Sequence, residues 1–164
     1  MNKKTKIYLA GPLGFSEAGR EFHNNSIIPL IKKLGLSFYD PWNTKLNKKI
    51  SEVGALEYGK RKRNQWHKLN SEIGKLNASE IYSSDIMLAV LDGTDVDSGT
   101  AAEIGYAFAK GKTIIGYRGD FRLSADNEGS TVNIQVEYFI RASGGTIITS
   151  IKQLKSALSK LVNS

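Results

Sequence analysis

Hydrophobic residues along the chain fall into short continuous runs separated by stretches of helical spacing. The two clearest runs are residues 6–10 and 85–91. Continuous apolar runs of this length are typical of parallel strands that are covered on both faces. Gly11-Pro12-Leu13-Gly14 follows the first run and Asp92-Gly93 follows the other, and such breakers mark loops. We expect both runs to be buried strands.

The remaining segments alternate between helix and strand. A helical pattern begins at Ser16 and stops at Gly35, with Pro29 as the main objection to it. A short second strand is expected over residues 36–39, and the polar stretch 43–84 has apolar residues at helical intervals that predict two helices. Further along we expect a helix over 101–110, a strand over 113–117, a turn-rich excursion over 118–130, an apolar segment over 132–140, a strand over 146–149 and a helix over 151–161.

This alternation predicts an α/β fold. The expected architecture is a doubly wound, flavodoxin-like, mostly parallel sheet of five strands with helices on both faces, because parallel strands need crossover connections. The 164 residues, 40% of them hydrophobic, suit one domain over residues 1–164. Ligands in such folds bind at the carboxyl ends of the strands. The loops to inspect are therefore residues 10–16, 40–43, 92–103 and 117–133.

Composition narrows the chemistry. The chain has no cysteine, so disulfides, thiolate metal sites and a cysteine nucleophile are excluded. His23 and His67 have no carboxylate or second imidazole at ligand spacing, and we assign them no role. The apolar run near the start spans only four residues, far short of a signal peptide or a membrane span. We expect a cytoplasmic protein without a membrane partner.

The net charge of +7 and the pI near 9.5 are compatible with an anionic partner. The basic run Lys60-Arg61-Lys62-Arg63, with Trp66 nearby, is the first place to look for a nucleic-acid contact. A charged run on a helix is usually a solvated face, and the chain has no recognisable nucleic-acid module. We therefore do not expect a nucleic-acid partner.

Glu103 can be interpreted in two ways. Thr100-Ala101-Ala102-Glu103 matches a capping box, in which a glutamate only ties down the helix start. Taken alone, this local pattern favours the cap. The same glutamate lies early in a helix that follows the central strand, where partial positive charge favours the ionised carboxylate that a nucleophile needs.

Other polar groups are expected at the same edge of the sheet. Asp92, Asp95 and Asp97 follow the central strand, and Tyr8 lies in the neighbouring one. Such a cluster can bind a divalent metal, or it can carry out glycosyl chemistry with one carboxylate attacking the anomeric carbon. Spacing alone does not choose between these chemistries.

Four segments resemble the nucleoside 2-deoxyribosyltransferase family, namely residues 7–12, 85–90, 97–107 and 120–133. The third is the most specific, because an acidic residue and a glycine precede a glutamate that is followed by Ile-Gly-Tyr-Ala. The resemblance implies that Glu103 attacks C1′ of a 2′-deoxynucleoside and that a free nucleobase then takes the sugar, with retention of configuration. It implies no metal and no organic cofactor.

The resemblance also assigns roles around this nucleophile. Tyr8 would donate a hydrogen bond to Glu103 and orient it, and Asp97 would hold the sugar hydroxyl or the base. Asp92 is a further candidate at the same rim. Phe15 would pack on the base, although a hydrophobic contact at a helix start explains it equally well.

The later part of the chain supplies further expected contacts. Asp120 and Asp126 would contact the base edge, and Asn133 would reach a neighbouring subunit's site to bind the 5′-hydroxyl, which implies a homo-oligomer. Two positions depart from the family pattern. Asn77 stands where several members have an aspartate that protonates the leaving base, and an amide cannot do this. Gln135 stands where a methionine is common.

Two alternatives remain open at this point. One is a hydrolase of the same superfamily that cleaves 2′-deoxynucleoside 5′-monophosphates, with water in place of the acceptor base. The other is a module that binds a nucleotide without turning it over, in which Glu103 is only a cap.

Overall fold

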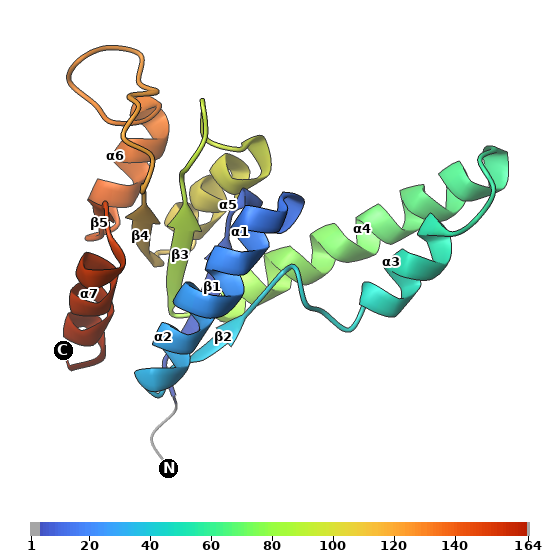
Figure 1. The fold of residues 1–164 in the computed structure, drawn as a ribbon, viewed down its shortest axis with the longest axis horizontal. Coiled ribbons are helices and arrows are strands. Elements are labelled where there is room, and N and C mark those ends of the chain that lie inside the picture. Colours follow the sequence, from blue (N-terminus) through green and yellow to red (C-terminus); the bar gives the residue numbers. More distant parts are fainter. Residues whose placement is uncertain (1–3, 164) are drawn as a thin grey trace.

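A parallel sheet forms the centre of the molecule in the computed structural model, which describes residues 4–163 (Figure 1). Over this range the strands are β1 (Lys6–Ala10), β2 (Ser37–Tyr39), β3 (Ile86–Val90), β4 (Thr113–Tyr117) and β5 (Thr146–Ile148). Their order is β2-β1-β3-β4-β5 and every pairing is parallel. The flavodoxin-like expectation is confirmed. The extent of the domain over residues 1–3 and 164 lies outside the described residues.

Helices cover both faces of this sheet (Figure 1). The α-helices are α1 (Glu17–Phe22), α2 (Ile28–Lys33), α3 (Asn47–Gly54), α4 (Lys60–Ser83), α5 (Ser98–Ala109), α6 (Ile134–Ala142) and α7 (Ile151–Asn163), and the segment between β1 and α2 also contains a 3-10 turn (Pro12–Phe15) and a π turn (His23–Ile27). One face packs against α2 and α7, and the other face packs against α4, α5 and α6.

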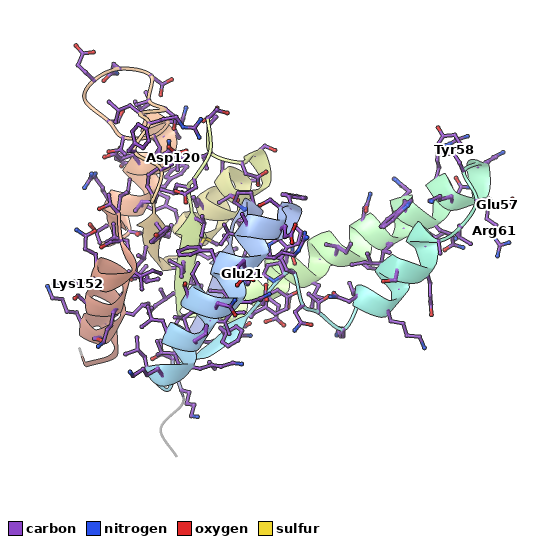
Figure 2. The ribbon with its side chains drawn as sticks, viewed as in Figure 1. Glu21, Glu57, Tyr58, Arg61, Asp120 and Lys152 are labelled. Carbon is purple, nitrogen blue, oxygen red and sulfur yellow. The ribbon has the colours of Figure 1, made fainter. Side chains whose placement is uncertain are left out.

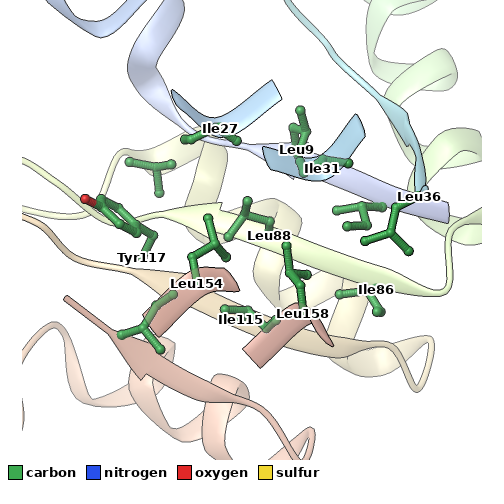
Figure 3. Packing of buried hydrophobic residues seen from close by; sticks show 13 residues of the cluster. Leu9, Ile27, Ile31, Leu36, Ile86, Leu88, Ile115, Tyr117, Leu154 and Leu158 are labelled. Atoms are coloured by element: carbon green, nitrogen blue, oxygen red, sulfur yellow. The ribbon is translucent and has the colours of Figure 1, made fainter. Parts of the chain in front are cut away.

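Alternating strand residues feed two separate hydrophobic cores, because successive side chains of a strand point to opposite faces. Leu9 and Leu88 face α2 and α7, where they join Ile31 and Leu154 (Figure 3). Their neighbours on the strands, such as Tyr8 and Met87, face α4, α5 and α6. The ring of Tyr8 is therefore part of the core. Its hydroxyl lies toward the carboxyl edge of the sheet.

Pro29 is accommodated by a local change in the helix. A proline inside an α-helix lacks an N–H group and clashes with the carbonyl four residues earlier. Here the π turn His23–Ile27 directly precedes α2, and Pro29 occupies the first turn of α2. The single helix expected from Ser16 is therefore three consecutive helical segments, which begin where Ser16 Oγ accepts the Gly19 N–H at 3.0 Å.

The helix α3 and the first part of α4 form an arm over residues 45–75 that extends away from the sheet, whereas the end of α4 packs on the sheet through Ile81 (Figure 1). Residues 45–75 hold nine Lys or Arg and three Asp or Glu, a net charge of +6 in a chain of +7. Tyr58 and Arg61 lie at its tip (Figure 2). Lys60, Arg61 and Arg63 are exposed, as expected of a solvated face, whereas Lys62 Nζ donates to the carbonyls of Gly54 and Leu56. No helix within residues 4–163 is long and apolar enough to cross a membrane.

Candidate active site

A cleft of about 610 Å³ opens where the loops after β1 and β2 meet the start of α5, the helix that follows β3. The strand order reverses direction between β1 and β3, and ligands of such sheets bind at this point. The arm forms the opposite wall. The cleft is lined by Gly11, Phe15, Pro41, Trp42, Asn47, Ile50, Ser51, Asn70, Ile73, Asn77, Asp97, Gly99, Thr100 and Glu103.

Asp97, and not Thr100, caps the helix that carries Glu103. Asp97 Oδ2 accepts the Thr100 N–H at 2.9 Å and the Thr100 hydroxyl at 3.0 Å, so α5 begins at Ser98, three residues before the expected start. The capping-box interpretation of Thr100 and Glu103 is wrong. With an acidic cap already in place, Glu103 falls in the second turn and its carboxylate is directed to other partners.

The hydrogen-bond partner of the Glu103 carboxylate is Tyr8. The buried Tyr8 hydroxyl donates to Glu103 Oε1 at 2.6 Å, which is the hydrogen bond that the resemblance implied. Burial, followed by the charge of Glu103, raises the pKa of Tyr8 well above its usual range. The phenol is therefore neutral at physiological pH and remains a donor to the carboxylate.

Opposing effects act on Glu103 itself. Burial raises the pKa of this carboxyl, the hydrogen bond from Tyr8 lowers it, and the nearby charge of Asp97 raises it. The net direction is upward because burial dominates. A desolvated carboxylate held by one phenol is poorly shielded by water, and this makes it a suitable nucleophile.

Tyr39 stands behind Tyr8 at the same edge. The two rings stack with centroids 5.5 Å apart. Burial and the charge of Glu80 raise the pKa of Tyr39 to about 12, and its hydroxyl donates to Asn77 Oδ1 at 3.5 Å. Asn77 comes from α4 just after the arm, so α4 is tied to the sheet at the cleft.

Phe15 and Trp42 form an aromatic wall. Phe15 is 73% exposed and meets Trp42 edge to face, with ring centroids 4.7 Å apart. Trp42 Nε1 donates to the Gly11 carbonyl at 3.1 Å. A Cβ at Gly14 would lie 1.9 Å from the Trp42 ring, so this packing requires glycine. Sequence reasoning selected the loop 40–43 but missed Trp42, whose role depends on a contact with the loop after β1.

A buried contact between a histidine and a carboxylate lies next to this wall. His23 Nε2 lies 3.1 Å from Asp40 Oδ2, and Asp40 Oδ1 accepts the Trp42 N–H at 3.0 Å. The interpretation of His23 as a residue without a carboxylate is wrong. The crossover from β1 to β2 brings together two residues that are far apart in the sequence, and their spacing gave no sign of it.

The family follows from sequence as well as from this geometry. Residues 7–135 match the sequence model of the nucleoside 2-deoxyribosyltransferases. The chain belongs to this family. The matched range includes every residue that lines the cleft. No curated protein matches the chain.

Solved structures of similar fold include family members. A 2-desoxiribosyltransferase from Leishmania mexicana is 23% identical, with a TM-score of 0.64 over 98% of each chain. A conserved protein from Enterococcus faecalis V583 is 22% identical, with a TM-score of 0.69 over 97% of this chain and 99% of that one. A CMP N-glycosidase from Clostridium botulinum is 18% identical, with a TM-score of 0.58 over 96% and 99%. At these identities the likeness shows the fold, and the family itself is one of enzymes that transfer or cleave at glycosidic bonds.

The structure thus brings five of the site residues expected from the family resemblance to one cleft. Asn77, Asp97, Glu103 and Phe15 line it, and Tyr8 reaches it through its hydrogen bond with Glu103. Their roles toward a substrate remain predictions. The other four expected residues lie elsewhere in this chain.

Asp92 and Asp120 belong to the loops after β3 and β4. Asp92 Oδ1 accepts the Asp120 N–H at 3.0 Å. Asp120, labelled in Figure 2, forms an ion pair with Arg122. The hydrogen bonds from Arg122 hold the pKa of that carboxyl well below its usual range. Neither residue lines the cleft, and both act here as loop braces.

Asp126 and Asn133 organise the start of α6. Asn133 is its N-cap and its Oδ1 accepts the Gln135 N–H at 3.0 Å. Asp126 Oδ2 accepts the Ile134 N–H at 2.9 Å. Neither side chain lines the cleft of its own chain. A contact between either of them and a substrate requires a rearranged loop or a second subunit.

Arg118 fixes the loop between β3 and α5 and was not anticipated from sequence. Its guanidinium is fully buried and donates to the carbonyls of Leu91, Gly93 and Arg122, the last at 2.6 Å. A charged group so far from water needs such partners. These bonds hold the loop that leads into Asp97 and therefore help to place Glu103.

The acidic residues after β3 do not converge on one point. Asp95 Oδ1 accepts the Val96 N–H, Asp97 caps α5 and Asp92 braces Asp120. Within residues 4–163 there is no group of three or more His, Cys, Asp or Glu side chains arranged to hold a metal ion.

Proposed function

We propose that this chain is a nucleoside 2-deoxyribosyltransferase that moves 2-deoxyribose between nucleobases through a covalent intermediate on Glu103. The observation that carries the proposal is the 2.6 Å hydrogen bond from Tyr8 to Glu103 at the base of the cleft. A carboxylate fixed in this way, with an aromatic wall nearby, fits the two parts of a nucleoside: the sugar at the carboxylate and the base on the rings.

In the proposed reaction an oxygen of Glu103 attacks C1′. The C1′–N bond breaks and its electron pair leaves with the base. A second base then attacks C1′ from the opposite face, which releases the Glu103 carboxylate, and two inversions give net retention. A 2-deoxy sugar suits this chemistry, because it has no electron-withdrawing 2′-hydroxyl to oppose the positive charge that develops on the ring.

The polar groups of the cleft favour a nucleoside over a nucleotide. Its lining is made of amides, hydroxyls and two carboxylates, and it contains no lysine or arginine among the residues that the structure describes. A phosphate monoester is usually held by cations or by backbone N–H groups at a helix start. Here the start of α5 is already occupied by Asp97. This supports the transferase over the monophosphate hydrolase.

The proposal includes an assembly in which Asn133 of one subunit completes the cleft of another. Asn133 lies away from the cleft of its own chain, and it is followed on α6 by two exposed apolar residues, Ile134 (51% exposed) and Tyr138 (59% exposed). Phe121 and Leu123, in the loop before α6, are exposed as well. Ile134 and Tyr138 are four residues apart and therefore share one face of α6, and exposed apolar faces are typical of protein interfaces.

The test is transfer between defined substrates. The protein is incubated with 2′-deoxyuridine plus hypoxanthine, and separately with 2′-deoxyinosine plus adenine, and the products are separated by chromatography. New nucleoside that depends on Glu103 supports the proposal, so Glu103→Gln is the control. We expect this variant to lose at least about 10³-fold in rate, as removal of a nucleophile does.

The other outcomes separate the alternatives. Free base without new nucleoside would indicate a hydrolase, and the same assay with 2′-deoxynucleoside 5′-monophosphates would test that branch. Binding of nucleosides without any turnover, with Glu103→Gln binding equally well, would leave a binding module and overturn the proposal.

A further inference from the structure

The cleft offers a departing base no acid of its own. Asp97 and Glu103 are the ionisable side chains among the lining residues described by the structure. Glu103 faces the sugar as the proposed nucleophile, and Asp97 Oδ2 is bound to the start of α5. The remaining polar groups are amides and hydroxyls, which do not protonate a leaving group at neutral pH.

Among the lining residues that the structure describes, Asn47, Asn70 and Asn77 carry amides, and they are not equivalent. Asn70 is exposed on α4. Asn47 is used within its own loop, because its Oδ1 accepts the Thr44 N–H at 3.0 Å and its Nδ2 donates to the Trp42 carbonyl at 3.0 Å. It braces the aromatic wall. Asn77 instead lies on α4 with its carbonyl turned back toward the sheet, where Oδ1 accepts the Tyr39 hydroxyl.

This long contact of 3.5 Å favours one orientation of the Asn77 amide. The Tyr39 phenol is neutral at physiological pH, as an ordinary tyrosine is, and burial raises its pKa further, to about 12. It therefore has a proton to donate. Once Oδ1 is the acceptor of that proton, the amide group Nδ2 is the end that remains for a ligand. Asn77 thus presents N–H donors, and not an acceptor, to the cleft.

We propose that the cleft selects nucleosides whose base has a carbonyl oxygen where others have an amino group, with Asn77 Nδ2 as the donor to that oxygen. The preferred bases are uracil, thymine, hypoxanthine and guanine. The inference rests on the proposed transferase function and names the class of base for that site.

The chemistry of departure explains why this contact matters. As the C1′–N bond breaks, the electron pair passes to the base nitrogen and is delocalised onto the carbonyl oxygen. An N–H donor at that oxygen stabilises the developing anion, which takes a proton from water after it leaves. An amino group of the base at the same place would face the N–H donors of Asn77, and neither group would have an acceptor. By microscopic reversibility, the same preference holds for acceptor bases.

The first experiment compares matched donors that differ at one substituent. Base release and new nucleoside are measured from 2′-deoxyuridine against 2′-deoxycytidine, and from 2′-deoxyinosine against 2′-deoxyadenosine, with thymine present in every reaction as the common acceptor that takes the sugar from Glu103. We expect the carbonyl member of each pair to react at least about 10-fold faster, because an amino group would leave unpaired a donor that the bound base covers. Equal rates, or faster amino members, would overturn the selectivity while the transferase function stands. No release from any of the four would overturn the proposed function and the selectivity with it.

Two variants test the role of Asn77. Asn77→Asp replaces the donor with a carboxyl group that accepts from an amino group when ionised, so we expect the ratio of carbonyl to amino rates to fall at least about 10-fold. Tyr39→Phe frees the amide to turn, and the ratio is expected to move toward one. Asn64→Asp and Tyr58→Phe, on the exposed arm, are the matched controls and should leave the ratio unchanged. Because the ratio compares two substrates on one preparation, partial loss of folded protein does not affect it. An unchanged ratio in both cleft variants would overturn the assignment of Asn77.

Discussion

At the residue scale, the pair formed by Tyr8 and Glu103 couples activity to pH. Glu103 must be ionised to attack, so activity is present above its pKa and is lost as the pH falls through it. The hydrogen bond from Tyr8 lowers this pKa. Tyr8→Phe should therefore move the acid limb of the kcat/KM profile to higher pH and reduce kcat/KM about 10- to 100-fold, as loss of a bond to a charged group does. An acid limb that stays in place would contradict the pairing.

The same burial predicts that Glu103 weakens the fold. Its pKa in the folded state is raised above the value of 4.5 expected when it is exposed. The folded state is therefore favoured while the carboxyl is protonated, and stability is lost as the pH rises through the raised pKa. Glu103→Gln removes this charge and should raise Tm at pH 8 by about 2–4 °C, or roughly 1 kcal/mol for a chain of this size. The gain should be smaller at pH 5, and differential scanning calorimetry at both pH values checks it.

At the element scale, Asp97 has two effects: its side chain caps the start of α5, and its charge raises the pKa of Glu103. Two substitutions separate these effects. Asp97→Ala should cost about 0.5–2 kcal/mol in free energy of unfolding, whereas Asp97→Asn keeps an acceptor and should cost little. Both variants remove a negative charge that raises the pKa of Glu103, so both should move the acid limb of activity to lower pH. Urea denaturation and pH profiles on the same variants measure the two effects. A stability loss equal in Asn and Ala would contradict capping by the side chain.

Also at the element scale, the loop after β1 and the loop after β2 are fitted to each other through Gly14 and Trp42. Gly14→Ala places a methyl group inside the Trp42 ring, so Trp42 must move away from Phe15. We expect KM for the nucleoside to rise about 10-fold or more and the tryptophan fluorescence to change, since lost ring contacts are worth about 0.5–1.5 kcal/mol beyond area. Gly74→Ala is the control, because a Cβ there meets no atom within 4 Å and should slightly stabilise α4.

At the scale of the whole molecule, the proposed assembly links quaternary structure to activity. Ile134 and Tyr138 are exposed on α6 next to Asn133. Replacing both apolar residues with serine should yield monomers by light scattering and, because each cleft then lacks Asn133 of a neighbour, should reduce kcat/KM at least about 10-fold. Asn133→Ala should lose similar activity and keep the assembly. A wild-type chain that is a fully active monomer would contradict this arrangement.

Local sequence was sufficient for the elements whose pattern is set by burial on both faces. The strands over residues 6–10 and 113–117 have the bounds expected of them. Prediction was weaker where two local signals compete. Thr100 and Glu103 fit a capping box, but Asp97 stands three residues before Thr100 and is the stronger cap, which moved the helix start. Pro29 argued against one continuous helix, and the chain resolved the conflict with a π turn.

Sequence by itself determined the order of strands and helices and, through the motif around Glu103, the family. Only the tertiary structure decided which side chains share the cleft. Periodicity and spacing act over a few residues, whereas the contacts of Trp42 with Gly11, of His23 with Asp40 and of Tyr39 with Asn77 join segments 17 to 38 positions apart in the printed sequence. Such contacts depend on how the crossover connections pack the helices on the sheet and on which polar groups are buried by that packing. The polarity of Asn77, and with it the proposed choice of base, follows from that packing.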